Sequence, residues 1–201
     1  APAAYQGGEH REERDLEQLH LVLGFPGLSY DDPDFYAGSV LSTLLGGGMS
    51  SRLFQEIREK RGLVYSIYSF TSAYQDGGLF GIYAGTGESE ARELVPVLCG
   101  EIGRVIGDAA EDETARARAQ IKAGLLMSLE STMARAEQLG QQMLIFGRPV
   151  PPEEVVAKID AVDAAAVRRV AERVFRTAPT LAALGPVGQL EGYDAIRARI
   201  G

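Results

Sequence analysis

The 201-residue chain is 45% hydrophobic, which is enough for one sizeable domain with its own core. Its 20 basic and 28 acidic residues give a formal net charge of −8, and this balance argues against a nucleic-acid partner because phosphates would be repelled. The same charge would attract a basic peptide. No apolar run approaches the roughly 18 residues of a membrane-spanning helix, so we expect no membrane contact.

Cys99 is the single cysteine, so no internal disulfide forms and nothing requires an oxidising compartment. It lies in an apolar run that begins at Leu94, where a small core residue is expected rather than a reactive thiol. The first residues show no basic region followed by an apolar one, so no signal peptide is visible in this sequence.

Residues 1–14 are polar and contain glycine, and we expect them to be a linker from an upstream domain that is missing. Residues 15–201 are then a single domain. Residues 17–25 are apolar enough for a central strand, which ends at Pro26-Gly27. Asp31-Asp32-Pro33 marks a helix start, because an acidic cap is followed by proline in the first turn.

A short charged helix is expected after three consecutive glycines, with Gly62 as its stop. The order of all predicted elements indicates an α+β fold, a two-layer α/β sandwich with a largely antiparallel sheet covered by helices on one face. Apolar residues at helical spacing are expected in the core, namely Leu125, Leu126, Met127 and Leu129 with Met133, Leu139, Met143 and Leu144. The later predicted elements are strands at 64–74, 79–84 and 180–185 and helices at 88–107, 112–130, 132–146, 153–159, 163–176 and 189–199.

The candidate site is the pair Arg58 and Tyr65. Arg58 falls in the last turn of the short helix, where a cation suits the carbonyl end of the helix dipole, and Tyr65 begins the strand that follows. Because the chain reverses at Gly62, we expect the two side chains to face the same space. The structural alternative is that Arg58 forms an ion pair with Glu56 or Glu59 while Tyr65 packs at a sheet edge.

The glycine segment Gly46, Gly47 and Gly48 has two interpretations. A glycine-rich loop before a helix can bind an anion, which would point to a small-molecule kinase. The GxxxxGK[ST] pattern of nucleotide-binding loops is absent, however, and no lysine lies nearby. We therefore favour a loop that lets another chain segment approach closely.

One long stretch, LGGGMSSRLFQEIREKRGLVYSIYSF followed by AYQDGGLFGIYAGT, resembles the C-terminal half of the insulinase and mitochondrial-processing-peptidase family of zinc metallopeptidases (the pitrilysin superfamily). The resemblance is closest to the bacterial members. It covers essentially the whole chain, from QLHLVLGFPG through MSLES to TLAALGP. It implies the processing-peptidase-like metallohydrolase fold and a bacterial cytoplasmic location, with the periplasm as the alternative.

The family's zinc motif, HxxEH with a distant glutamate, is not complete in this sequence. His10-Arg11-Glu12-Glu13-Arg14 has arginine where the second histidine ligand should stand, and an arginine cannot bind zinc. His20 stands alone in an apolar strand. The resemblance thus implies that a partner domain binds the zinc, and that this chain binds no metal.

The resemblance also implies roles for the candidate residues. Arg58 and Tyr65 match the pair that holds the substrate backbone and stabilises the tetrahedral intermediate, and the three glycines match a flexible loop lining the substrate chamber. The expected function is therefore the substrate-binding half of a zinc metalloendopeptidase acting on peptides or presequences, basic ones in particular, and inactive alone. Its partner would be an upstream catalytic domain or a separate catalytic subunit, in a homodimer or heterodimer. The alternative is a non-catalytic scaffold or regulatory subunit of such a complex, and the role of Glu130 stays open.

Overall fold

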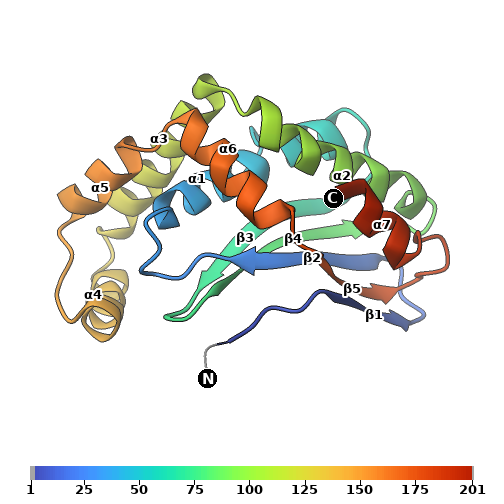
Figure 1. Cartoon of the computed structure of the whole chain (residues 1–201), viewed down its shortest axis with the longest axis horizontal. Coiled ribbons are helices and arrows are strands. Elements are labelled where there is room, and N and C mark those ends of the chain that lie inside the picture. The colour runs from blue at the N-terminus through green and yellow to red at the C-terminus, as the bar shows by residue number, and fades with distance from the viewer. Residues whose placement is uncertain (1–2, 201) are drawn as a thin grey trace.

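A twisted sheet forms one layer of the protein and helices form the other in the computed structural model, which describes residues 3–200 (Figure 1). Within these residues the sheet has five strands in the order β1-β5-β2-β4-β3. β1 runs parallel to β5, and every other neighbouring pair is antiparallel. The strands are β1 Gly8–Glu13, β2 Leu19–Gly27, β3 Ser66–Ala73, β4 Gly78–Thr86 and β5 Thr180–Gly185.

The central strand β2 explains why helices cover one face. Its residues alternate between buried and half-buried, and Leu19, Leu21, Leu23 and Phe25 are the buried ones. Since successive side chains on a strand point to opposite faces, one face of β2 packs on the helical layer and the other does not. The predicted two-layer, largely antiparallel α/β architecture is confirmed.

The helices lie close to their predicted positions. Thr132–Phe146 has the bounds expected from its Ser131 cap and its Gly147 stop, whereas the last helix begins at Tyr193 rather than near 189. Within residues 3–200, no helix combines the length and hydropathy needed to cross a membrane. The helices are α1 Phe35–Gly46, η1 Phe54–Glu59, α2 Ala91–Asp108, α3 Glu111–Ser128, α4 Thr132–Phe146, α5 Pro152–Asp160, α6 Ala164–Phe175 and α7 Tyr193–Ile200.

The prediction of a linker over residues 1–14 is wrong for Gly8–Glu13, which form the edge strand β1. Residues 1 and 2 lie outside the described part of the chain. β1 pairs with β5 in register, so that Gly8 lies beside Thr180. Its polar composition is compatible with a strand because an edge strand gains its backbone hydrogen bonds from one neighbour and can present charged side chains to solvent.

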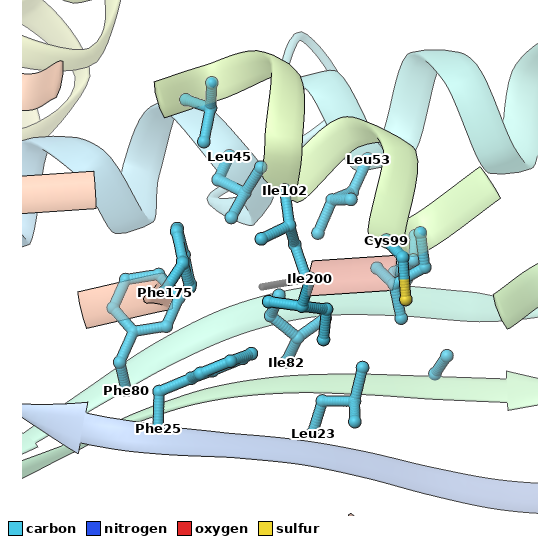
Figure 2. Close-up of a cluster of buried hydrophobic side chains, with 14 of the residues drawn as sticks. Leu23, Phe25, Leu45, Leu53, Phe80, Ile82, Cys99, Ile102, Phe175 and Ile200 are labelled. Atoms are coloured by element: carbon cyan, nitrogen blue, oxygen red, sulfur yellow. The ribbon is translucent and has the colours of Figure 1, made fainter. Parts of the chain in front are cut away.

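The core lies between the sheet and the helices. Phe175 of α6 packs edge-on against both Phe25 and Phe80, with ring centroids 4.9 and 5.2 Å apart. Figure 2 shows the three rings in the core. Cys99 of α2 is in the same buried cluster. The expectation of a small core residue is confirmed by this burial, which also raises the pKa of the thiol to about 12.

Helix α4 lies at one end of the molecule, beyond the sheet (Figure 1), and its polarity is the reverse of that expected. Its one buried residue is Gln142, whose Oε1 accepts a hydrogen bond of 2.8 Å from the backbone N–H of Val150. The prediction of a core position is wrong for Met133, Leu139, Met143 and Leu144, all of which are exposed, Leu144 by 85%. It is also wrong for Leu126 and Met127 near the end of α3, which are 54% and 69% exposed.

Candidate functional site

The candidate site is built on one continuous segment that runs from the end of α1 through η1 to the start of β3. Gly46, the last residue of α1, is buried against β3. A Cβ atom at this position would lie 2.4 Å from the backbone nitrogen of Ser69. Glycine is therefore required here for a close approach between helix and strand, rather than for a left-handed turn.

The loop after Gly46 is held by hydrogen bonds to its carbonyl groups. Gln120 of α3 donates through Nε2 to the Gly47 carbonyl at 2.6 Å, and Gln55 donates to the Met49 carbonyl at 2.7 Å. The backbone N–H of Gly47 donates to the Thr43 carbonyl at 2.9 Å. An anion-binding loop needs free backbone N–H groups, but the Gly47 N–H already donates to Thr43. This disfavours the anion-binding interpretation.

The segment Phe54–Glu59 is wound as a π-helix, η1, which the sequence did not predict. Its wider winding is visible in the bond from the Lys60 N–H to the Gln55 carbonyl, five residues back, at 3.0 Å. Ile57 is buried and holds η1 to the core. Short π-helical segments occur frequently at functional sites in proteins.

Arg58 is exposed on η1 and forms no ion pair with any residue between 3 and 200. The structural alternative of a pair with Glu56 or Glu59 is therefore wrong. Residues one and two positions apart on a helix do not face each other, and Glu56 is bound instead by Lys60 and Arg61, at 2.8 and 3.1 Å. The guanidinium carbon of Arg58 lies 4.8 Å from the centre of the Phe54 ring.

Gly62 reverses the chain after η1, as predicted. Its φ of 66° lies in the left-handed region that favours glycine. The turn is closed by two hydrogen bonds, from the Gly62 N–H to the Arg58 carbonyl at 3.1 Å and from the Leu63 N–H to the Ile57 carbonyl at 3.0 Å. The backbone that carries Arg58 is thus part of the turn itself.

Tyr65 lies at the other end of this reversal, one residue before β3 begins at Ser66. Its backbone N–H donates to the Gly85 carbonyl at 2.8 Å, so the main chain is attached to β4. Its side chain is 61% exposed, and its hydroxyl has no hydrogen-bond partner within residues 3–200. Arg58 and Tyr65 therefore both project donor groups into solvent from the two ends of one fixed turn.

The described residues do not fit a zinc ion. Between residues 3 and 200 no three His, Cys, Asp or Glu side chains are grouped so that they could hold a metal. His20 Nδ1 lies 2.8 Å from the hydroxyl of Tyr83, and Arg14 pairs with Glu12 in the segment that partly matches the zinc motif. Glu130 lies exposed between α3 and α4, and nothing in its surroundings assigns it a role.

Phe54 is a residue of this segment that was not among the candidates predicted from the sequence. The signal that could have found it is its spacing of four residues from Arg58, which brings side chains together on a helix. The same spacing shows that no carboxylate stands three or four residues from Arg58, since those neighbours are Phe54, Gln55, Arg61 and Gly62.

Comparison with known proteins finds relatives that are all named as peptidases or peptidase subunits. Residues 1–121 match the family model described as "Peptidase M16 inactive domain". A zinc protease from Rickettsia bellii is 40% identical over 96% of this chain and 47% of its own length, and one from Streptomyces coelicolor is 42% identical over 91% and 41%. The human mitochondrial-processing peptidase subunit beta is 33% identical over 99% of this chain and 43% of its own.

Among solved structures, a chain of complex III2 from Candida albicans, bound to Inz-5, superposes with a TM-score of 0.90. The match covers 99% of this chain and 50% of that one, and at 22% identity it shows a shared fold. The chain thus spans about half the length of the curated relatives that it matches.

Proposed function

The chain belongs to the M16 peptidase family, as the part that the family model describes as inactive, and from this premise we propose that it is the substrate-binding half of a zinc metalloendopeptidase. In this proposal it contributes Arg58 and Tyr65 to a site completed by another domain or subunit. The observation that carries the proposal is the turn at Gly62, which presents two exposed donor side chains that have no polar partner of their own in residues 3–200.

Arg58 would bind the backbone of an extended peptide. A guanidinium has five N–H donors and no acceptor, so it suits the carbonyl oxygens of a peptide and can donate to two of them at once. Arg58 makes no ion pair with residues 3–200, so no ion pair has to be broken before its N–H groups can bind a substrate. The net charge of −8 adds an attraction for basic peptides and presequences.

Tyr65 would stabilise the charge that develops during cleavage. Attack on a peptide carbonyl converts its oxygen into an oxyanion. A hydrogen bond from a phenol O–H to that oxygen becomes stronger as the negative charge develops in the transition state. Attachment of the Tyr65 backbone to Gly85 fixes the origin of this side chain. Loss of one such donor costs on the order of 10²–10³ in rate.

The zinc would be bound outside this chain. Relatives are named zinc proteases, whereas the donors found in residues 3–200 do not fit the ion. We propose that an upstream domain or a separate catalytic subunit carries the HxxEH motif, and that the two parts assemble as a fused protein, a homodimer or a heterodimer. On this proposal the chain is inactive by itself. The loop of Gly46, Gly47 and Gly48 would line the substrate chamber that the two parts form together.

The test combines this chain with the unmatched portion of the Rickettsia bellii relative and measures cleavage of a fluorogenic, basic, presequence-like peptide. We expect activity to require both parts, and Arg58→Ala or Tyr65→Phe to lower kcat/KM by about 10² or more. Tyr74→Phe is the matched control, because Tyr74 is an equally exposed tyrosine at the far end of β3. Peptidase activity of this chain alone that a chelator abolished would refute the proposal.

The second candidate is a non-catalytic scaffold or regulatory subunit, which the description of the family model as an inactive domain favours. The same experiment separates the two functions. If this chain restores cleavage and both variants restore it equally well, Arg58 and Tyr65 take no part in catalysis and the chain is a scaffold.

A further inference from the structure

The guanidinium of Arg58 lies over the ring of Phe54 on η1. The guanidinium carbon is 4.8 Å from the ring centroid, within the range of a cation–π contact. We propose that Phe54 is a positioning residue that orients Arg58 toward the substrate backbone while leaving the Arg58 N–H donors free. This inference rests on the substrate-binding role proposed above for Arg58.

The kind of contact matters more than its strength. A carboxylate partner would orient a guanidinium by accepting its in-plane N–H groups, and those are the groups that a peptide carbonyl needs. An aromatic ring attracts the cation through its negatively charged face instead, and within residues 3–200 no acceptor takes a hydrogen bond from the Arg58 guanidinium. Phe54 therefore holds the side chain of Arg58 without competing with a substrate.

The ring itself is well placed to serve as a fixed support. Phe54 is half-buried and lies on η1 between two fully buried neighbours, Leu53 and Ile57. The start of the segment is fastened by Arg52, which is bound to Glu113 of α3, and its end by the turn at Gly62. A ring held in this way limits the rotamers of Arg58 before any peptide arrives, so less conformational freedom is lost on binding.

The acidic residues near Arg58 do not bind its guanidinium and so do not compete with Phe54 for it. Glu56 is bound by Lys60 and Arg61, and Arg61 also lies 3.5 Å from Glu93 of α2. Glu59, the adjacent residue, is exposed and lies one position along the helix, where side chains diverge. Phe54 is the one aromatic ring that contacts Arg58 within residues 3–200.

The test uses the assembled enzyme and the basic fluorogenic peptide described above. Phe54→Leu and Phe54→Met remove the ring but keep an apolar side chain, and we expect each to raise KM by about two- to fivefold, the factor that an exposed cation–π contact is worth, with kcat unchanged. Phe54→Tyr keeps the ring face and should retain the wild-type KM. Thermal unfolding of each variant reports whether the fold is intact.

A double-mutant cycle decides whether Phe54 acts through Arg58. In an Arg58→Ala background, Phe54→Leu should have no further effect on KM. The inference is overturned if Phe54→Leu raises KM equally in that background, if Phe54→Tyr behaves like Phe54→Leu, or if Phe54→Leu has the wild-type KM while Arg58→Ala does not. If Arg58→Ala itself is fully active, the proposed function fails first, and the two failures are thereby distinguished.

Discussion

The guanidinium of Arg52 and the carboxylate of Glu113 form a two-pronged pair, with Nε donating to Oε1 at 2.9 Å and Nη2 donating to Oε2 at 2.6 Å. Their side chains are only 11% and 21% exposed. The pair joins the start of η1 to α3. Burial alone raises the pKa of Glu113, but the hydrogen bonds from Arg52 and from the Ala110 N–H outweigh it and leave that pKa below its ordinary value.

We predict that Glu113→Gln lowers the free energy of unfolding by about 1–3 kcal/mol at neutral pH, because Arg52 loses one charged hydrogen-bond partner in a largely buried pair and keeps only Asp108. Denaturant unfolding measures the loss. Asp112→Asn is the matched control, since Asp112 pairs with Arg116 on the exposed side of α3, and such surface pairs contribute roughly 0–1 kcal/mol.

The same pair predicts a pH dependence. A carboxyl group whose pKa is lower in the folded state stabilises the protein above its unfolded pKa, and this contribution is lost as the pH falls through the folded pKa. Wild-type stability should therefore decline as the pH falls below about 4.5, the ordinary value for glutamate. Glu113→Gln should decline less over that interval, and an equally steep decline would contradict the assignment.

We predict that Gly46→Ala destabilises the protein by about 1–3 kcal/mol, the range for overpacking. The added methyl group would meet the Ser69 backbone, which cannot move aside as a flexible side chain would. Gly124→Ala is the control, because Gly124 lies within α3 with open space around it. That change should stabilise the helix by about 0.5–1 kcal/mol. Equal effects of the two substitutions on the free energy of unfolding would show that the close approach of Gly46 to Ser69 does not determine stability at this position.

The turn between Arg58 and Tyr65 should depend on the backbone preference of Gly62. Nothing lies within 4 Å of a Cβ placed there, so Gly62→Ala is expected to cost about 1–2 kcal/mol from its left-handed backbone alone. Gly62→Asn should cost less, because asparagine adopts this conformation more readily. Thermal unfolding compares the two variants, and a larger loss for asparagine would contradict this explanation.

Cys99 should resist alkylation in the folded protein. An ordinary thiol, with a pKa of about 8.5, is partly ionised at mildly alkaline pH, whereas burial raises the pKa of Cys99 to about 12. Mass spectrometry after iodoacetamide treatment should show an unmodified native chain and a singly modified chain in denaturant. Rapid modification under native conditions would place the thiol at the surface.

Local signals in the sequence predicted those parts of the fold that local interactions determine. The cap at Ser131 and the left-handed stop at Gly147 set the bounds of α4 correctly, and Gly62 ended η1 as expected. These features depend on backbone groups and on the few residues next to them. The prediction therefore did not need the rest of the chain.

Features that depend on distant segments were not predicted. β1 is a strand because β5, about 170 residues later, lies beside it, and nothing within residues 8–13 encodes that partner. Apolar residues at helical spacing placed α4 correctly but did not show that Met133, Leu139, Met143 and Leu144 would be exposed. At the candidate site, the sequence placed Arg58 and Tyr65 at the ends of one turn, but it did not predict the π-helical winding or the contact with Phe54.

The position of β5 between β1 and β2 has a consequence for biosynthesis. Both neighbours leave the ribosome more than 150 residues before the strand that joins them. Until then, β1 has no ladder partner and β2 has one open edge. Closing so long a loop slows folding, and an unpaired edge can meanwhile pair with another chain. A chain that stops before Thr180 should aggregate during synthesis, and one that continues past Gly185 should not.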